Sequence, residues 1–240
     1  MKFNILFLFL LASLNSYSAE YLQTIKEDIL SPYTTEALPL VKIGTGLTLL
    51  TYFLKNSSLQ PDIAHAKPLG KYSKIGYNLG QLLPNVTYAV LMGGDYLITS
   101  NKKSLERMEL IVKATIYADM TTELLKRSFN ENRPNGGKLS FPSGHATCAF
   151  AFASVISMEH TLPWAIAANT MASFVAFSRM NDNAHYLHDV VAGATIGSMY
   201  GVGLYYANKN RDHDKNVENP SVFVLVPIRD GIASSYMLNF

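Results

Sequence analysis

Residues 126–134 read KRSFNENRP, residues 141–145 read FPSGH and residues 178–189 read SRMNDNAHYLHD. Among their residues, three cationic side chains, two histidines and one carboxylate stand out because they come in a fixed order with fixed local spacings. A phosphate near its transition state carries charge on three equatorial oxygens, so it needs several positioned donors, which Lys and Arg provide. The sequence therefore predicts a site that binds a phosphate and attacks it. The cations are Lys126, Arg133 and Arg179, the histidines are His145 and His185, and the carboxylate is Asp189.

The middle segment is typical of a turn that leads into a helix. Ser143 is a favourable N-cap, Gly144 allows a close approach of the backbone, and residues 146–156 favour a helix. Free backbone N–H groups at the start of a helix bind anions. The segment predicts an anion-binding turn.

The third segment places a histidine and a carboxylate four residues apart. His185 and Asp189 would then share one face of a helix. The carboxylate can hold one ring nitrogen and leave the other as a nucleophile. This arrangement follows the logic of a catalytic triad in which the histidine itself attacks.

Taken separately, each segment also has an ordinary structural explanation, as solvated helix charges, a surface pair or a loop. Together they specify eleven positions in order, and all eleven match the three-part signature of the type 2 phosphatidic acid phosphatase (PAP2) superfamily, which the chain resembles. That superfamily also contains bacterial class A acid phosphatases and vanadium haloperoxidases. Only seven residues separate Pro134 from Pro142 here, which suggests a more open phosphate pocket.

The resemblance implies a role for each residue, and an all-α PAP2-like bundle of about six core helices over residues 33–208. His185 would form a phosphohistidine, Asp189 would orient it, and His145 would protonate the leaving oxygen and later activate water. No metal and no cofactor is implied. Ser178 either adds a hydrogen bond or only packs. The phosphate would be held by Lys126, Arg133, Ser143, Gly144 and Arg179.

The N-terminal segment resembles a secretory signal peptide. Lys2 is followed by an apolar run over residues 5–12 and then by small residues, which predicts cleavage near Ala19. We therefore expect three parts: a signal peptide over 1–19, the phosphatase domain over 20–208, and a charged linker with a β-hairpin over 209–240. The single cysteine, Cys148, excludes an internal disulfide and is expected to be a small buried residue.

Hydrophobic patterning and turn residues predict the remaining organisation. Gly193, Gly197, Gly201 and Gly203 suggest tight helix packing, and His188 is assigned no chemistry. Loops are expected over residues 60–72 and 130–141. Helices are expected over residues 21–32, 37–54, 73–100 with an interruption near Pro84, 104–129, 143–160, 163–179 and 186–208.

Localisation is the hardest question. Residues 161–178 and 190–208 are uncharged over a length that could span a bilayer. Against this, charged residues make up 16% of the chain and the mean hydropathy is only +0.10. We favour an exported, periplasmic and largely globular bundle that contacts the membrane; the alternative is an integral inner-membrane protein.

The tail has a different character. Residues 209–219 are charged and linker-like, and residues 221–228 and 232–240 favour two strands around Arg229-Asp230-Gly231. Such a hairpin would pack on the bundle or pair with another chain, which would make the protein an oligomer.

Three functions remain open at this level. The first is a metal-independent phosphatase acting on a phosphorylated or pyrophosphorylated lipid, or on a small phosphomonoester as a soluble periplasmic acid phosphatase. The second is a vanadium haloperoxidase, for which the chain is short. The third is a non-catalytic binding protein, which the intact motif disfavours. The net charge of +2 and the absence of a basic run with interleaved aromatics argue against nucleic acid as a partner.

Overall fold

The computed structural model describes residues 21–55, 59–218, 222–228 and 231–237, so the predicted signal peptide lies outside the described residues. The body of the protein is a helical bundle, as the sequence predicts, and residues 21–34 are helical as well. Six of the described helices have 16 residues or more: α2 (Leu38–Phe53), α5 (Leu83–Thr99), α6 (Lys102–Phe129), α7 (Gly144–Glu159), α8 (Leu162–Asn181) and α9 (Leu187–Glu218). The shorter elements are α3 (Leu59–Ala66), the 3-10 helix η1 (Gly70–Tyr72), α4 (Ser73–Leu79), β1 (Val222–Ile228) and β2 (Gly231–Met237).

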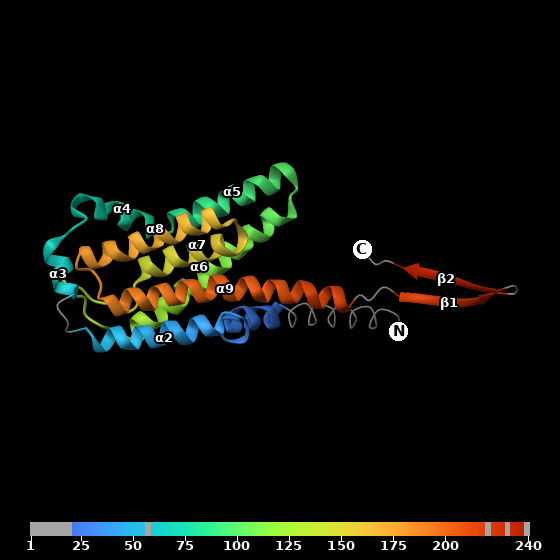
Figure 1. Cartoon of the computed structure of the whole chain (residues 1–240), viewed down its shortest axis with the longest axis horizontal. Coiled ribbons are helices and arrows are strands. Elements are labelled where there is room, and N and C mark those ends of the chain that lie inside the picture. Colours follow the sequence, from blue (N-terminus) through green and yellow to red (C-terminus); the bar gives the residue numbers. More distant parts are fainter. Residues whose placement is uncertain (1–20, 56–58, 219–221, 229–230, 238–240) are drawn as a thin grey trace, which may run out of the picture.

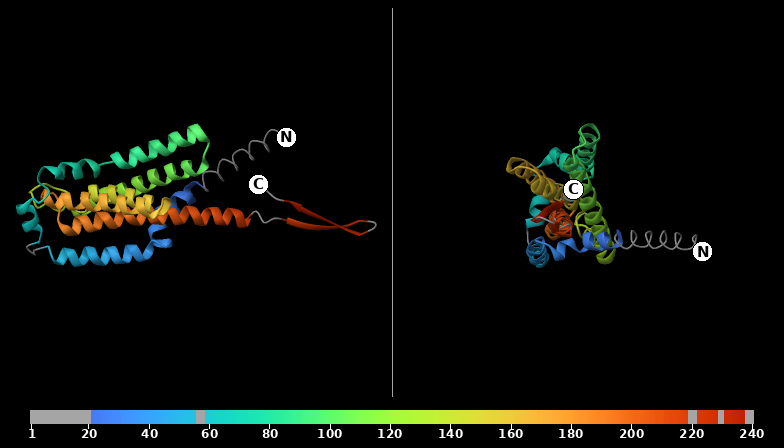
Figure 2. Two further views of the ribbon diagram at one scale, coloured as in Figure 1. Left: turned by 45° about the horizontal axis from the view of Figure 1, so that its top comes forward. Right: turned by 90° about the vertical axis from the view of Figure 1, so that its right-hand side faces the viewer.

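The long helices run roughly along the long axis of the molecule (Figure 1). Helix α7 lies at the centre, where it packs against α6, α8 and α9, and α2 lies along α9 on the side away from α7 (Figure 2). Most of the buried α7 side chains are small, including Ala149, Ala151 and Ala153. Small side chains let neighbouring backbones approach closely, so α7 can form contacts on several sides.

Three glycines of α9 make the contact with α7 unusually close. A Cβ at Gly197 would lie 2.3 Å from the carbonyl oxygen of Thr147, and one at Gly193 would lie 2.4 Å from that of Ser143. Gly201 faces Ser154 in the same way, and Gly203 faces Ser31 and Pro32. The predicted role of these glycines in helix packing is therefore confirmed.

Local sequence signals set most helix ends. Asn101 caps α6 by accepting a hydrogen bond from the Lys103 N–H, and Ser143 caps α7 by accepting one from the Ala146 N–H. Pro84 lies in the first turn of α5, where its missing N–H costs nothing, and α4 ends before it. The predicted interruption near Pro84 is thus confirmed.

The loop predicted over residues 60–72 was wrong, because the structure has α3 and η1 there. Two prolines suggested a loop, but neither interrupts a helix. Pro61 lies in the first turn of α3, where proline is tolerated, and Pro68 comes after α3 has ended.

The tail also differs from its prediction in one respect. Helix α9 continues beyond Asn208 through the charged stretch to Glu218, so most of the segment interpreted as a linker is helical. Strands β1 and β2 follow and are antiparallel, with Val222 opposite Met237. The hairpin's packing on the bundle and its pairing with another chain stay predictions.

Buried ion pairs fasten the N-terminal helix to the bundle. Asp28 is 1% exposed and lies 2.9 Å from Lys113 Nζ of α6 and 2.7 Å from Arg211 Nη2 of α9.

No helix among the described residues is both long enough and apolar enough to cross a membrane.

Candidate active site

The three sequence motifs meet at one end of the bundle. Lys126 is near the end of α6, His145 is at the start of α7, Arg179 is near the end of α8, and His185 and Asp189 flank the start of α9. The segment between α6 and α7 carries Arg133 and crosses the same end. A backbone hydrogen bond of 2.9 Å from the Ser143 N–H to the Asp189 carbonyl ties the motifs of α7 and α9 together.

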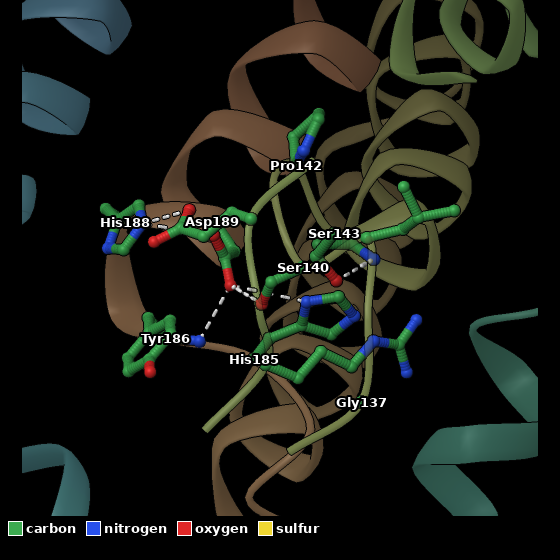
Figure 3. Close-up of polar contacts among 12 residues, drawn as sticks. Gly137, Ser140, Pro142, Ser143, His185, Tyr186, His188 and Asp189 are labelled. Atoms are coloured by element: carbon green, nitrogen blue, oxygen red, sulfur yellow. Dashed lines mark hydrogen bonds and ion pairs between the residues drawn. The ribbon is translucent and has the colours of Figure 1, made fainter. Parts of the chain in front are cut away.

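His185 and Asp189 are adjacent and buried. His185 Nδ1 lies 3.4 Å from Asp189 Oδ2, and the two residues are 2% and 0% exposed (Figure 3). This distance is longer than that of a charge-assisted hydrogen bond, but such contacts commonly tighten when substrate binds. Because Nδ1 faces the carboxylate, Nε2 is the nitrogen left for chemistry. Burial lowers the pKa of His185, so its imidazole is neutral and nucleophilic near neutral pH.

Asp189 accepts further hydrogen bonds that keep it ionised. Its Oδ2 accepts one of 2.5 Å from the Ser140 hydroxyl and one of 2.8 Å from the Tyr186 backbone N–H (Figure 3). Burial alone would raise the pKa of Asp189, but the bonds from His185, His188 and Ser140 outweigh it and hold this pKa far below its usual value. The carboxylate is thus charged at any physiological pH.

Lys126 is buried and held by backbone carbonyls. Its Nζ donates to the carbonyls of Leu139, at 3.1 Å, and Pro142, at 2.6 Å. Burial, and then the nearby charge of Arg133, lower the pKa of Lys126. The ammonium group therefore lies against the turn that precedes α7.

Arg179 is 3% exposed and oriented by several neighbours. Its Nε and Nη2 donate to the Ser178 hydroxyl at 3.1 and 3.0 Å, and Nη2 also lies 2.9 Å from Asp182 Oδ2. Its guanidinium lies 5.2 Å from the ring centroid of Tyr77. Of the two alternatives for Ser178, the structure therefore has the hydrogen bond, which orients the guanidinium.

His145 occupies an electropositive environment. Its ring lies 4.9 Å from that of Tyr77, and its buried Nε2 has no hydrogen-bond partner among the described residues. Burial, followed by the charges of Arg179, His185, Arg133 and Lys126, lowers the pKa of His145 to about 4. Arg133 is half-buried, donates to the Lys138 carbonyl at 3.1 Å, and is near enough to affect each of these groups.

The structure adds one residue that the sequence analysis set aside. His188 is fully buried, and its Nε2 lies 3.1 Å from Asp189 Oδ1 and 3.1 Å from Glu131 Oε2 (Figure 3). Burial alone would lower the pKa of His188, but the two carboxylates outweigh it and raise it. The adjacency of His188 to Asp189 was the only signal in the sequence, because Glu131 is distant in the chain.

Glu131, His188 and Asp189 also form a group of the type that could hold a metal ion, with ligand atoms within 4.8 Å of one another. However, Glu131 forms an ion pair with Lys55, and the imidazole of His188 already bridges the two carboxylates. The positive charge and the donors that these carboxylates require are therefore supplied by side chains.

The bundle thus gathers three cations, two histidines and a carboxylate around the start of α7. The family model of the PAP2 superfamily matches residues 110–213 of this chain. This range contains every residue of the site predicted from the sequence.

One known protein and two solved structures are similar to parts of this chain. A lipid A 1-phosphatase from Porphyromonas gingivalis is 35% identical over 130 residues, which are 52% of this chain and 28% of that protein, so the match spans little more than a quarter of its length. The crystal structure of Aquifex aeolicus LpxE has a similar fold, with a TM-score of 0.50 and 23% identity over 63% of this chain and 93% of that one. The crystal structure of the first transmembrane PAP2 type phosphatidylglycerolphosphate phosphatase from Bacillus subtilis gives a TM-score of 0.48 with 18% identity over 82% and 96% of the two chains.

Proposed function

We propose that this protein is a phosphatase that hydrolyses a phosphate or pyrophosphate ester of a lipid through a phosphohistidine at His185, without a metal ion. The observation that carries the proposal is the placement of His185, backed by Asp189, among the buried cations Lys126 and Arg179. The match of residues 110–213 to the PAP2 superfamily model and the similarity to a lipid A 1-phosphatase support it.

In the first step, Nε2 of His185 attacks the phosphorus while the bond from phosphorus to the leaving oxygen breaks. Asp189 stabilises the positive charge that develops on the imidazole. His145 donates a proton from its ring to the leaving oxygen. The low pKa of His145 in the free protein is compatible with this role, because a bound phosphate dianion offsets the surrounding cations and raises that pKa.

In the second step, His145 accepts a proton from a water molecule, whose oxygen attacks the phosphorus. The phosphorus–nitrogen bond breaks, which releases inorganic phosphate and regenerates neutral His185. Lys126, Arg133, Arg179 and the turn that begins at Ser143 hold the three equatorial oxygens in both steps.

Exposed apolar side chains support a lipid as the substrate. Along α2, Ile43, Leu47, Leu50 and Phe53 recur at helical spacing and are 65%, 48%, 55% and 80% exposed. Large apolar side chains grouped on a surface favour contact with a membrane or another apolar partner. This supports the predicted membrane contact and access to a lipid held there.

The test is phosphate release by the purified protein in a metal chelator, from a lipid phosphate and from a soluble phosphomonoester. We expect turnover of the lipid and a loss of about 10⁴-fold or more in His185→Ala. The matched control is His65→Ala, which removes an exposed histidine of α3 and should leave activity unchanged. Brief reaction with labelled substrate should trap an acid-labile phosphoenzyme in the wild type only.

Three outcomes would redirect the proposal. Full activity in His185→Ala would refute the mechanism. Equal turnover of the soluble monoester would favour a non-specific phosphatase over a lipid-directed one. Halide oxidation after addition of vanadate and peroxide, without phosphate release, would favour the haloperoxidase alternative.

A further inference from the structure

His188 lies in a position that packing fixes closely. It is 0% exposed and immediately precedes Asp189. Its ring is nearly parallel to those of Tyr186 and Phe141, at 5.4 and 5.9 Å between centroids, and Tyr52 of α2 meets it edge-on at 5.1 Å. A ring held by three aromatic neighbours cannot turn freely, so the direction of its Nε2 is set.

That Nε2 is directed between two carboxylates. It lies 3.1 Å from both Asp189 Oδ1 and Glu131 Oε2. Because both neighbours are acceptors, Nε2 carries a hydrogen whether the ring is neutral or charged. Asp189 Oδ1 is buried and has no hydrogen-bond partner among the described residues, so its ion-pair contact with His188 Nε2 at 3.1 Å is the contact that the site offers it. Without His188, this oxygen would lose its nearest partner.

The other carboxylate, that of Glu131, is also held by an ion pair. Glu131 forms an ion pair with Lys55, which follows α2, and the Lys55 ammonium also lies 4.1 Å from the ring centroid of Tyr186. The chain from Lys55 through Glu131 and His188 to Asp189 therefore connects the end of α2 to the start of α9. None of its first three members belongs to the sequence signature.

The two oxygens of Asp189 have separate tasks. Oδ2 faces His185 Nδ1 and also accepts from Ser140 and Tyr186, whereas Oδ1 faces His188. Rotation of the carboxylate would exchange these oxygens and disturb both sets of contacts. A donor fixed at Oδ1 prevents that rotation, as supporting hydrogen bonds do for other catalytic groups.

We propose that His188 is a positioning residue that holds the Asp189 carboxylate toward His185, with Glu131 and Lys55 supporting it from behind. The proposal rests on the proposed function, because it assumes that His185 is the nucleophile. It predicts that the hydrogen-bond donor at Nε2, and not the bulk of the ring, is what the site requires.

The main test compares two substitutions at one position. His188→Leu removes the donor and should lower kcat by about 100-fold, the order expected when a catalytic group is misplaced by about 1 Å, while KM changes less than about threefold. His188→Gln places an amide donor near the position of Nε2 and should recover kcat to within about tenfold of the wild type. The control is His160→Leu, which removes the histidine bonded to Tyr88 at the far end of α7 and should leave kcat unchanged.

A spectroscopic readout separates this proposal from the proposed function. The ¹⁵N shifts of the His185 ring report which nitrogen carries the hydrogen. We expect the Nδ1–H form in the wild type and in His188→Gln, and a mixture of tautomers in His188→Leu. If the wild type releases no phosphate but His188→Leu still changes the His185 tautomer, the phosphatase proposal fails while the positioning role stands.

Four results would overturn the inference. The first is full kcat in His188→Leu, and the second is an equal loss of kcat in the Leu and Gln variants with the fold intact. The third is an unchanged His185 tautomer in the Leu variant. The fourth applies if the Leu variant does not fold, and is unchanged kcat in both Glu131→Gln and Lys55→Met. When His188→Leu does fold, adding Glu131→Gln should cause little further loss, because the chain is already interrupted.

Discussion

Replacing Gly193 by alanine tests whether the contact between α7 and α9 sets the geometry of the site. The added Cβ would lie 2.4 Å from the carbonyl oxygen of Ser143 and 3.2 Å from the backbone nitrogen of Thr147. These are backbone atoms and cannot move aside as a side chain can. The helices must separate by about 1 Å to reach an ordinary contact distance of about 3.5 Å.

That separation acts directly on the site. Asp189 lies one helical turn before Gly193, and its carbonyl accepts the 2.9 Å hydrogen bond from the Ser143 N–H. We expect overpacking to lower the free energy of unfolding by about 1–3 kcal/mol. We expect kcat/KM to fall by about 100-fold, because the His185 side and the His145 side of the site move apart.

Gly46→Ala is the matched control, since a Cβ there meets nothing within 4 Å. Gly46 lies inside α2, so alanine should stabilise the protein by up to about 1 kcal/mol and leave activity unchanged. Urea denaturation with a constant m-value gives the stability change, and phosphate release gives the activity. A Gly193→Ala protein as stable and as active as the wild type would refute the reasoning.

Three further predictions concern charge. Burial lowers the pKa of His145 to about 4, below the value of about 6.5 in an unfolded chain, so the unfolded state binds the proton first and stability should fall as the pH drops from about 6.5 toward 4. In thermal denaturation between pH 7 and 4.5, the fall in Tm should therefore be smaller for His145→Gln than for the wild type. An equal fall in the two proteins would contradict this. Asp28→Asn weakens the pairs with Lys113 and Arg211 and should lower the free energy of unfolding by about 1–3 kcal/mol in urea without changing turnover, which any loss of kcat would dispute. Lys126→Met should lower kcat/KM by about 100- to 1,000-fold and weaken inhibition by vanadate in the phosphate-release assay; unaltered vanadate inhibition would remove this lysine from the phosphate site.

The sequence predicts well what depends on local spacing. Four residues separate His185 from Asp189, and the structure brings the two side chains together at the start of α9. Ser143 was predicted as a helix cap from its position before an alanine-rich run, and it caps α7. The cap is predicted correctly because its interacting groups lie within one turn of helix, where backbone geometry decides the outcome. The shared helix face predicted for His185 and Asp189 was wrong in one respect, because His185 precedes the start of α9 and only Asp189 lies within it.

What the sequence could not predict depends on contacts between distant segments. His188 was assigned no chemistry because its partners, Glu131 and Tyr52, come from a loop and a helix far away in the chain. No periodicity within α9 carries information about them. The helix α3 was missed for a related reason, since Pro61 is compatible with both a loop and a first helical turn, and the surrounding fold decides between them.

The electrostatics of the site explain why its buried cations have several hydrogen-bonding partners. Burial lowers the pKa of Lys126 and that of Arg179, and the nearby charge of Arg133 lowers both further. Backbone carbonyls accept hydrogen bonds from the Lys126 ammonium, whereas Asp182 and the Ser178 hydroxyl accept them from the Arg179 guanidinium. A phosphate dianion would supply the missing negative charge without any reorganisation of these groups, and such preorganisation is the main source of transition-state stabilisation in a site of this kind. Asp189 supplies part of that counter-charge, because its charge raises the pKa of Lys126, but its oxygens face Ser140, Tyr186 and the two histidines. Under the proposed function, the contacts that orient His185 would also keep the cations available for a phosphate.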